Sequence, residues 1–277
     1  MSRYNPIETV ILGALNEDLI THDMTSEWLF ASSDQSKAHL IAKEDGILAG
    51  IEVFKRTFEL VDSNSIVEIC IEDGSRVSKG DIVALISGST KSLLFAERTA
   101  LNFLQRMSGI ATETHKYVTC VEDLNVKIVD TRKTAPGLRI IDKLAVKMGG
   151  GTNHRFNLSD GVLIKDNHIK AAGGIQNAIE KVRSHIPHTL KIEIEVESLE
   201  GLHEALESGA DIIMLDNMTT QMMSQAVEIT AGRAILEASG NMNLVRLREV
   251  AETGVDIISV GGLTHSVKAL DLSLRFF

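Results

Sequence analysis

The spacing of apolar residues changes near residue 90 and divides the chain into two regions. Before it, apolar and polar residues form short runs over 37–49 and 66–71, and acidic-glycine turn signals lie at 44–46 and 72–74. Such runs predict short β-strands joined by turns. From Leu93 onward the apolar residues recur every three or four positions, which predicts an amphipathic helix. Its apolar stripe is expected to consist of Leu93, Ala96, Ala100, Leu104, Met107 and Ala111.

Short apolar segments alternate with helical stretches beyond residue 125, and this pattern predicts a parallel β-sheet. The segments 207–213 and 252–258 repeat one motif, in which a glycine ends a helix and a strand begins directly after it. Connections this short favour a closed or nearly closed α/β barrel over a doubly wound sheet. The predicted strands are 126–130, 162–165, 190–196, 211–215, 234–238 and 256–260.

Composition and charge exclude several classes of protein. The chain has 277 residues and a formal net charge of −10, which disfavours a general nucleic-acid-binding protein, because that function needs a broad cationic surface. We expect no secretory signal and no membrane-spanning segment, since the necessary apolar stretches are missing from the sequence. Cys70 and Cys120 form no CxxC pair, so neither a disulfide framework nor a thiolate metal site is expected. We therefore expect a cytoplasmic protein that binds neither nucleic acid nor membranes.

Polar residues gather where the predicted strands end. The carboxyl ends of barrel strands carry the chemistry of α/β barrels, and charged groups there must be paired, bind a metal or meet a charged ligand. The sequence therefore predicts a ligand site at this end of the barrel. The residues concerned are Asp130-Thr131-Arg132-Lys133-Thr134, Lys165-Asp166-Asn167-His168, Glu195, Asp216-Asn217, Glu237-Ala238-Ser239-Gly240 and Gly261-Gly262.

Two charge patterns indicate the kind of ligand. Basic residues outnumber acidic ones between residues 130 and 170, although the whole chain is acidic, and a locally basic barrel mouth suits phosphates, diphosphates and carboxylates. Glu193, Glu195 and Glu197 share one face of their strand. That face either looks into the barrel, where cations such as Mg²⁺ must offset the carboxylates, or forms a solvated row on an exposed edge strand.

Several smaller features allow two interpretations. The glycine run 149–151 allows either close backbone approach or a sharp turn that presents His154 and Arg155, but it matches no nucleotide-binding motif. The residues after the last two strands, 239–240 and 261–262, are either phosphate-binding loops or ordinary tight turns. Periodicity alone places Arg98 on the solvent side of the predicted helix.

Seven blocks of the sequence resemble quinolinate phosphoribosyltransferase, in that family's order and over essentially the whole chain. The combination of DTRKT, NHR and LIKDNH is specific to it. The blocks are AERTALNFLQRMSGIAT (96–112), DTRKTAPGLR (130–139), GGGTNHRFNLSDGVLIKDNHI (149–169), EIEVE (193–197), DIIMLDNM (211–218), LEASGN (236–241) and ISVGGLTHSVKALDLSL (258–274).

This resemblance implies a fold and an activity. The fold is an N-terminal α/β sandwich over residues 1–110, joined by a C-terminal helix over 266–277, and an open α/β barrel over 111–265. The reaction converts quinolinate and phosphoribosyl pyrophosphate to nicotinate mononucleotide, CO₂ and pyrophosphate in NAD biosynthesis. It requires Mg²⁺ and no organic cofactor. The resemblance also implies a homodimer in which Arg98 of one subunit completes the site of the other.

The resemblance assigns roles to residues of this chain. The expected catalytic residues are Lys133, His154, Lys165, Glu195 and Asp216, of which Glu195 and Asp216 serve the ribose hydroxyls and the metal, partly through substrate and water. Lys165 or His154 is a candidate proton donor to C2 of the product. The expected substrate-binding residues are Arg98, Arg132, Lys133, Thr134, His154, Arg155, Lys165, Glu195, Asp216, Ser239, Gly240, Asn241, Gly261, Gly262 and Leu263.

Two departures and three alternatives remain. The family often has alanine where Gly262 stands and glycine where Asn241 stands, which leaves the details of phosphate contact open. One alternative is a related phosphoribosyltransferase-like protein associated with molybdenum transport, against which the intact LIKDNH block argues. A lyase that forms a Schiff base on Lys165 is the second, and a sensor that binds phosphoribosyl pyrophosphate without turnover is the third.

Overall fold

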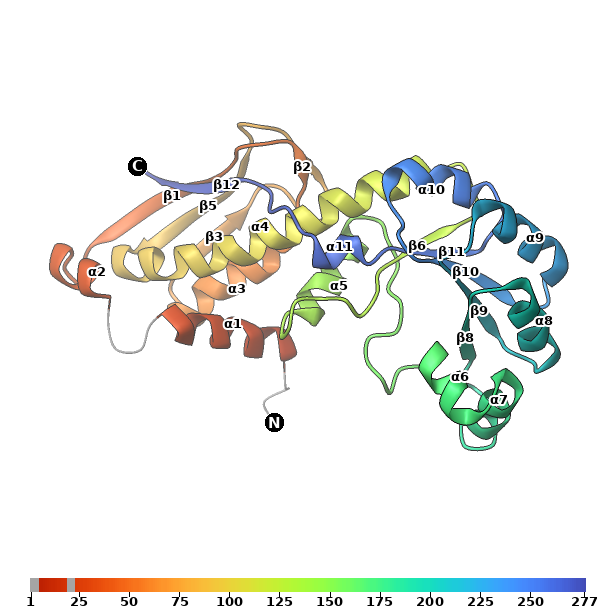
Figure 1. Ribbon diagram of the computed structural model, residues 1–277. Helices are drawn as coiled ribbons and strands as arrows, with labels where there is room; N and C mark the ends of the chain where they lie inside the picture. Colours follow the sequence, from red (N-terminus) through yellow and green to blue (C-terminus); the bar gives the residue numbers. More distant parts are fainter. Residues whose placement is uncertain (1–4, 19–22) are drawn as a thin grey trace. The chain divides into compact units, whose positions relative to one another are not determined.

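The computed structural model describes residues 5–18 and 23–277, which form two compact units (Figure 1). The first unit includes residues up to 115 together with 134–150 and 266–277, and the second consists of 116–133 and 151–265. Neither unit is continuous in sequence. The boundary predicted between residues 110 and 111 stays a prediction.

The first unit is built on an antiparallel sheet of four strands in the order β12-β1-β5-β3, with a separate two-stranded pair, β2-β4. The predicted helix from Leu93 is confirmed as part of α4, and all six residues of its predicted stripe have no exposed surface. Four of them, Leu93, Ala96, Ala100 and Leu104, pack in one core with Phe54 and Phe58 of α3 and with strand residues such as Leu40 and Ile86. The elements of this unit are α1 (Pro6–Asp18), α2 (Met24–Leu29), β1 (Gln35–Ala42), β2 (Gly46–Ile47), α3 (Ile51–Val61), β3 (Ile66–Ile69), β4 (Arg76–Val77), β5 (Ile82–Ser89), most of α4 (Thr90–Cys120), α5 (Arg139–Met148) and β12 (Leu272–Phe276).

The C-terminal segment corrects a prediction, because the helix expected over 266–277 is instead strand β12, which pairs antiparallel with β1. The side chains of Leu270, Leu272 and Leu274 are buried, whereas Asp271 and Arg275 between and beside them are exposed. A period of two belongs to a strand with one buried face. The alternation of leucines with polar residues over 270–275 is a strand signal, and the helix expected here contradicts it.

The second unit is a parallel sheet of six strands in the order β6-β11-β10-β9-β8-β7. All six predicted strands are confirmed. Its elements are β6 (Lys127–Val129), β7 (Val162–Ile164), α6 (Asp166–Ala172), α7 (Ile175–Arg183), β8 (Ile192–Val196), α8 (Leu199–Glu207), β9 (Ile212–Asp216), α9 (Thr220–Thr230), β10 (Ile235–Ser239), α10 (Leu244–Ala251), β11 (Ile257–Ser259) and α11 (Gly262–His265).

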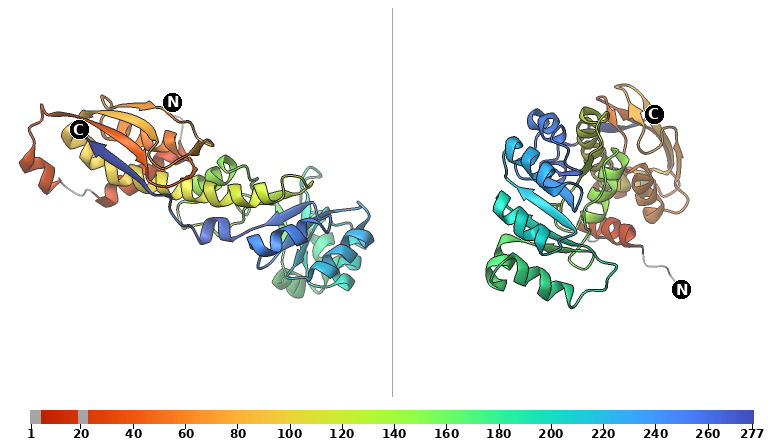
Figure 2. Two further views of the ribbon diagram at one scale, coloured as in Figure 1. Left: turned by 90° about the horizontal axis from the view of Figure 1, so that it is seen from above. Right: turned by 90° about the vertical axis from the view of Figure 1, so that its right-hand side faces the viewer.

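The strand order identifies the second unit as an open barrel. Strands β7 to β11 are neighbours in chain order, and the first strand, β6, pairs with the last, β11, as closure of a barrel requires. Figure 2 shows the second unit from two further sides. A doubly wound sheet would instead reverse its order at a switch point. The sheet stays open between β6 and β7, where Thr152 forms a single bridge with Val129. The prediction of an α/β barrel that is not fully closed is thus confirmed.

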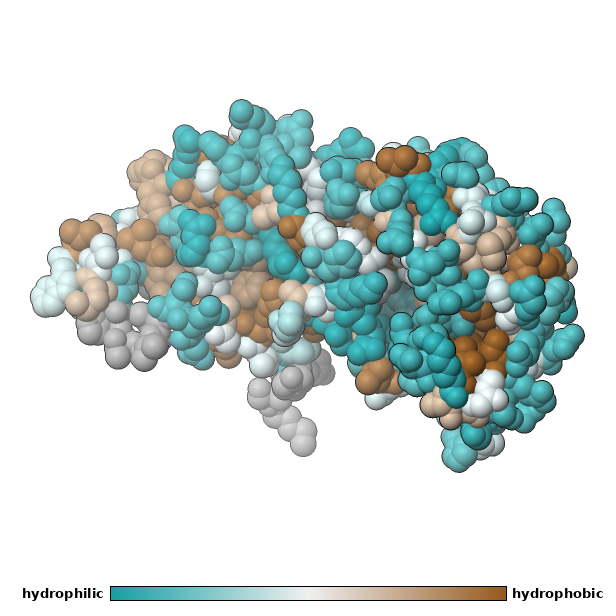
Figure 3. All heavy atoms as spheres, in the orientation of Figure 1, coloured by the Kyte–Doolittle hydropathy of each residue, from teal (hydrophilic) through white to brown (hydrophobic). Residues whose placement is uncertain are grey.

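Tight connections join helices α8 and α10 to the strands that follow them. Gly209 and Gly254, the glycines of the repeated motif, have φ values of 74° and 92°, a conformation that ends a helix at little cost for glycine. Hydrophilic residues are spread over the visible face of both units (Figure 3). Within the described residues, no helix combines the length and apolar character needed to cross a bilayer.

The strand at the C-terminus can be tested by unfolding. We expect Leu272→Ala to lower the free energy of unfolding by about 2–5 kcal/mol, since it removes a fully packed side chain. Arg275→Ala, on the exposed face of β12, should change it by less than about 0.5 kcal/mol. Urea titration of both variants gives these values. Equal effects at the two positions would contradict a strand with one buried face.

Candidate active site

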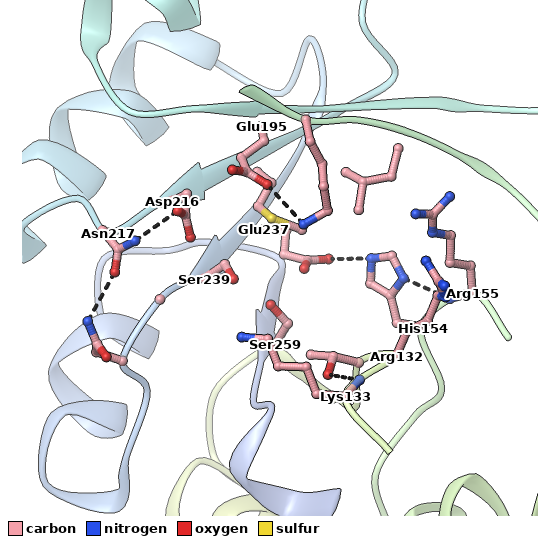
Figure 4. Close-up of a pocket in the computed structure, with 16 residues that line it drawn as sticks. Arg132, Lys133, His154, Arg155, Glu195, Asp216, Asn217, Glu237, Ser239 and Ser259 are labelled. Atoms are coloured by element: carbon pink, nitrogen blue, oxygen red, sulfur yellow. Dashed lines mark hydrogen bonds and ion pairs between the residues drawn. The ribbon is translucent and has the colours of Figure 1, made fainter. Parts of the chain in front are cut away.

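A cavity of about 540 Å³ opens at the carboxyl ends of the barrel strands, within the second unit (Figure 4). It is the place at which the sequence predicted a ligand site, and every predicted strand end except the one at 261–262 contributes to it. The lining residues are Thr131, Arg132, Lys133, His154, Arg155, Leu163, Lys165, Glu195, Met214, Asp216, Asn217, Glu237, Ser239, Gly240, Asn241 and Ser259.

Asp130 joins two of the sequence motifs at the base of this cavity. Its carboxylate is fully buried at the end of β6, where Oδ2 accepts a hydrogen bond from Asn153 Nδ2 (2.6 Å) and Oδ1 accepts one from the N–H of His154 (2.9 Å). The first residue of DTRKT thereby holds the turn that carries NHR. Gly150, with φ of 90°, makes the sharp turn before it, as the glycine run predicted.

The basic side of the cavity consists of Arg132, Lys133, His154 and Arg155. The guanidinium of Arg155 donates to the carbonyl of Gly161 (2.9 Å), and burial together with the nearby charge of Arg132 lowers its pKa. Like charges brought this close repel one another, and an anion placed among them relieves that repulsion. This wall is therefore suited to a ligand with several negative charges.

Lys165 extends from the end of β7 toward the acidic side. Helix α6 begins directly after it, and the side chain of His168 accepts a hydrogen bond from the N–H of Lys165 (3.0 Å). Lys165 Nζ lies 3.4 Å from Glu195 Oε2. The LIKDNH block is thus a strand end and helix start whose histidine fixes the backbone beneath the lysine.

Glu195 and Asp216 form the acidic side, at the ends of β8 and β9. Burial raises the pKa of Glu195, and the charge of Asp216 adds to this, whereas Lys165 opposes it. Oxygens of Glu195, Asp216 and the exposed Glu197 lie within 4.8 Å of one another. A set made only of carboxylate oxygens matches the preference of Mg²⁺ for hard oxygen ligands.

The loops after β9 and β10 are held in an uncommon backbone conformation. Asn217 and Asn241 have φ values of 53° and 50°, and asparagine is among the few residues besides glycine that adopt this region readily. Asn217 donates to Asp216 Oδ2 (2.8 Å) and accepts from Asn241 Nδ2 (3.1 Å). A Cβ atom on Gly240 (φ 89°) would lie 2.2 Å from Asn217 Oδ1. The two loops therefore fit together only with glycine at position 240.

Sequence reasoning missed two glutamates inside the barrel. Glu193 and Glu237, on β8 and β10, are 4% and 1% exposed, and both lie next to the imidazole of His154. The alternation over 191–197 had placed Glu193 on a possible inner face, but it received no role. The alternative of an exposed edge strand is wrong, because β8 lies between β7 and β9.

Five predicted site residues do not line the cavity. Arg98 is exposed on α4, in the first unit. Thr134 accepts a hydrogen bond from Arg139 Nε (3.1 Å). Leu263 is buried and follows Gly261 and Gly262 at the start of α11, whose Thr264 hydroxyl donates to the carbonyl of Lys133 (2.9 Å). The roles assigned to these five residues stay predictions.

Comparisons with known proteins agree over the whole length of the chain. Sequence models of the N-terminal and C-terminal domains of quinolinate phosphoribosyl transferase match residues 23–108 and 110–275. The probable nicotinate-nucleotide pyrophosphorylase [carboxylating] of Bacillus subtilis is 45% identical over 258 residues, which cover 93% of this chain and 89% of that protein. The chloroplastic nicotinate-nucleotide pyrophosphorylase [carboxylating] of Arabidopsis thaliana is 44% identical, over 97% of this chain and 82% of that protein.

The solved structures give the same result. The crystal structure of NadC from Streptococcus pyogenes matches with a TM-score of 0.94 and 44% identity, and the match covers all of both chains. The nicotinate-nucleotide pyrophosphorylase from Francisella tularensis matches with a TM-score of 0.93 and 39% identity, over 98% of this chain and 96% of that one. The resemblance seen in the sequence motifs is confirmed, and the chain belongs to the quinolinate phosphoribosyltransferase family.

Proposed function

We propose that this chain converts quinolinate and phosphoribosyl pyrophosphate to nicotinate mononucleotide, CO₂ and pyrophosphate in the cavity at the barrel mouth. One observation carries the proposal: a wall of cationic side chains faces the carboxylates Glu195 and Asp216 across a single cavity. Quinolinate has two carboxylates and phosphoribosyl pyrophosphate has several phosphate oxygens, so both substrates are anionic. The ribose between them carries the hydroxyls and the carbon at which positive charge develops.

The basic wall provides most of the electrostatic catalysis. Arg132, Lys133, His154 and Arg155 bind the carboxylates of quinolinate and the diphosphate, with Lys165 at the border to the acidic side. When the bond from C1′ to the diphosphate breaks, negative charge grows on the leaving group. Cations that are already in place stabilise this charge without further reorganisation, and holding both substrates in contact adds the advantage of proximity.

The acidic pair serves the ribose and a divalent cation. Glu195 and Asp216 accept hydrogen bonds from the ribose hydroxyls, and the carboxylate of Glu195 favours the oxocarbenium character that C1′ acquires. Their all-oxygen donor set fits Mg²⁺, held partly through substrate and water. When bound, Mg²⁺ supplies positive charge to the departing pyrophosphate. The reaction needs no organic cofactor, because the glycosylated pyridine nitrogen is itself cationic and stabilises the C2 carbanion left by CO₂.

The backbone N–H groups of two loops bind the 5′-phosphate. One loop is 239–241, at the end of β10, and the other is 261–263, at the start of α11. Gly240 and Asn241 have left-handed backbone conformations, and turns of this kind can expose backbone N–H groups that bind anions.

The active form is a cytoplasmic homodimer in which Arg98 of each subunit enters the site of the other. Arg98 is exposed, and α2 presents Met24, Trp28 and Leu29 with 64%, 79% and 67% of their surface exposed. Apolar surface gathered on one short helix is typical of a protein interface. A Schiff-base lyase is disfavoured, since Lys165 lies half exposed beside a carboxylate and not in the apolar pocket in which such lysines are activated.

Incubation with quinolinate, phosphoribosyl pyrophosphate and Mg²⁺ tests the reaction, with CO₂ and a pyridine mononucleotide as products. We expect Arg132→Ala and Lys165→Ala each to lose at least about tenfold in turnover, the effect of removing one charge-stabilising contact. Lys170→Ala, on the exposed side of α6, is the matched control and should retain full turnover. Unchanged turnover in the first two variants would exclude the basic wall from the chemistry.

The fit of the two loops is tested at Gly240. Gly240→Ala places a Cβ against Asn217 and strains a left-handed backbone, so we expect turnover to fall by roughly a hundredfold, as misplacement of reacting groups does. Gly232→Ala is the control, because its φ of 75° gives the same strain while no atom lies within 4 Å of the added Cβ. Gly232→Ala should lose about 1–2 kcal/mol of stability from the left-handed backbone alone, and Gly240→Ala should lose more, because its Cβ also collides with Asn217. Equal turnover in the two would show that the fit between the loops is unimportant.

Subunit mixing tests the role of Arg98. Arg98→Ala and Lys165→Ala homodimers should each be nearly inactive. Coexpression of the two chains should restore up to about a quarter of the wild-type sites, because in a symmetric dimer each heterodimer has one site with both native residues. If Arg98 served its own subunit, the mixture would be no more active than its components, and if Arg98 served no site, Arg98→Ala alone would keep full activity.

A further inference from the structure

Two carboxylates occupy the interior of the barrel, where apolar side chains are expected. Glu193 of β8 and Glu237 of β10 lie on alternate strands and are 4% and 1% exposed. Alternate strands of a barrel contribute the side chains of one interior layer, and branched apolar residues dominate such layers. Two buried negative charges repel each other and lose their hydration. The fold accepts them only if a third group compensates.

His154 is that third group. Its Nε2 lies 3.1 Å from Glu193 Oε2 and 3.5 Å from Glu237 Oε2, and Nδ1 accepts a hydrogen bond from the N–H of Arg155 at 2.7 Å. Figure 4 shows the imidazole between the carboxylate of Glu237 and Arg155. The protein itself therefore engages both ring nitrogens, and Nε2 is directed at the carboxylates in the barrel interior.

Electrostatics keeps a proton on Nε2. Burial lowers the pKa of His154, but the hydrogen bonds and charges of Glu193 and Glu237 outweigh it and raise this pKa to about 10. A charged ring has no lone pair on Nδ1, so protonation there breaks the contact with the Arg155 amide. Relief of two buried carboxylates outweighs one hydrogen bond between neutral groups. In the charged ring and in the neutral tautomer alike, Nε2 keeps its proton.

We propose that Glu193 and Glu237 are positioning residues for His154: from inside the barrel they hold its Nε2 proton, so that His154 presents a fixed ring to the substrate and does not donate that proton. The charged groups around His154 include Glu193 and Glu237 at Nε2, Asp130 at its backbone N–H, Arg155 and, beyond Arg155, Arg132. This role deepens the proposed function, on which its catalytic part rests, and it removes the Nε2 proton of His154 from the candidates for transfer to C2.

The geometry of Glu237 sets it apart from a simple ion pair. Its Oε2 faces His154, whereas among the described residues none donates a hydrogen bond to the buried Oε1. A group with such a cost persists where function requires it. His154, Glu193 and Glu237 also have the donor atoms for a metal ion, and a bound metal would replace the Nε2 proton. The experiment separates these two arrangements.

The test uses the full chain labelled with ¹³C and ¹⁵N histidine, and the His154 signals are assigned by their loss in His154→Asn. In the wild type we expect a protonated Nε2 that does not titrate between about pH 6 and pH 9, because the ordinary pKa near 6.5 is displaced upward. In Glu237→Gln, which keeps the shape and removes the charge, the ring should titrate at a lower pH. Glu228→Gln, exposed on α9, removes the same charge elsewhere and should change neither signal nor activity.

Kinetics adds a second readout. Glu237→Gln should raise KM for quinolinate by about 10- to 100-fold, the range for residues that orient a ligand-binding group, with a smaller change in kcat. A purely structural defect would instead reduce the amount of active enzyme and leave KM unchanged. Elemental analysis of the purified protein completes the experiment.

Three results would overturn the proposal: a wild-type His154 that titrates near its ordinary pKa, a ring unaffected by Glu237→Gln, or stoichiometric metal that is lost in that variant. The spectroscopic result needs no substrate. It therefore decides the positioning role even if the cavity fails to turn over quinolinate, which would contradict the proposed function alone.

Discussion

Carboxylates cannot remain charged inside a protein unless positive or hydrogen-bonding groups lie against them, and this constraint shapes the second unit. Asp130, Glu193 and Glu237 are almost completely buried there. Their partners come from the single turn that carries Asn153 and His154. The buried carboxylates thus fix the position of that turn. Because Arg155 follows directly in the chain, the same contacts place it close to Arg132. The position of the proposed anion-binding residues thus depends on buried carboxylates.

The barrel brings these parts together from distant positions in the sequence. DTRKT follows β6, NHR precedes β7, and LIKDNH lies at the end of β7. The acidic pair, Glu195 and Asp216, lies at the ends of β8 and β9. Parallel strands all end at the same rim, so residues separated by a complete strand and helix become neighbours. The gap between β6 and β7 gives the NHR turn room to enter the barrel and reach the interior glutamates. The position of His154 inside the barrel therefore depends on the opening between β6 and β7.

The sequence was sufficient for most of the fold and for much of the site. Period and turn signals predict the α4 stripe and all six barrel strands, because burial on one side leaves a regular trace in sequence. Contacts between residues of different motifs leave no regular pattern in the sequence. Glu237 is therefore recognisable as a residue at a strand end, but its contact with His154 is not. The wrong helix at 266–277 has a different origin, since the alternating leucines of β12 were visible. Arg98 shows a third limit, because nothing in its sequence pattern separates the role that we propose for it in a partner subunit from that of any exposed arginine.

Residues with an uncommon backbone conformation line the cavity in the loops after β9 and β10. Among the described residues, Asn217, Ala231 and Asn241 are those other than glycine with positive φ, and two of these three line the cavity. Such conformations persist when the surroundings impose them, and they concentrate at functional sites. Here the surroundings include Arg246 of α10, which donates to the carbonyls of Met218 and Gly240 and so ties the β9 and β10 loops together. Asparagine at position 241 tolerates the left-handed backbone and adds a side-chain hydrogen bond to Asn217. Asn217 also donates to Asp216, so the loop that we propose for the phosphate is linked to a carboxylate that we propose for the ribose.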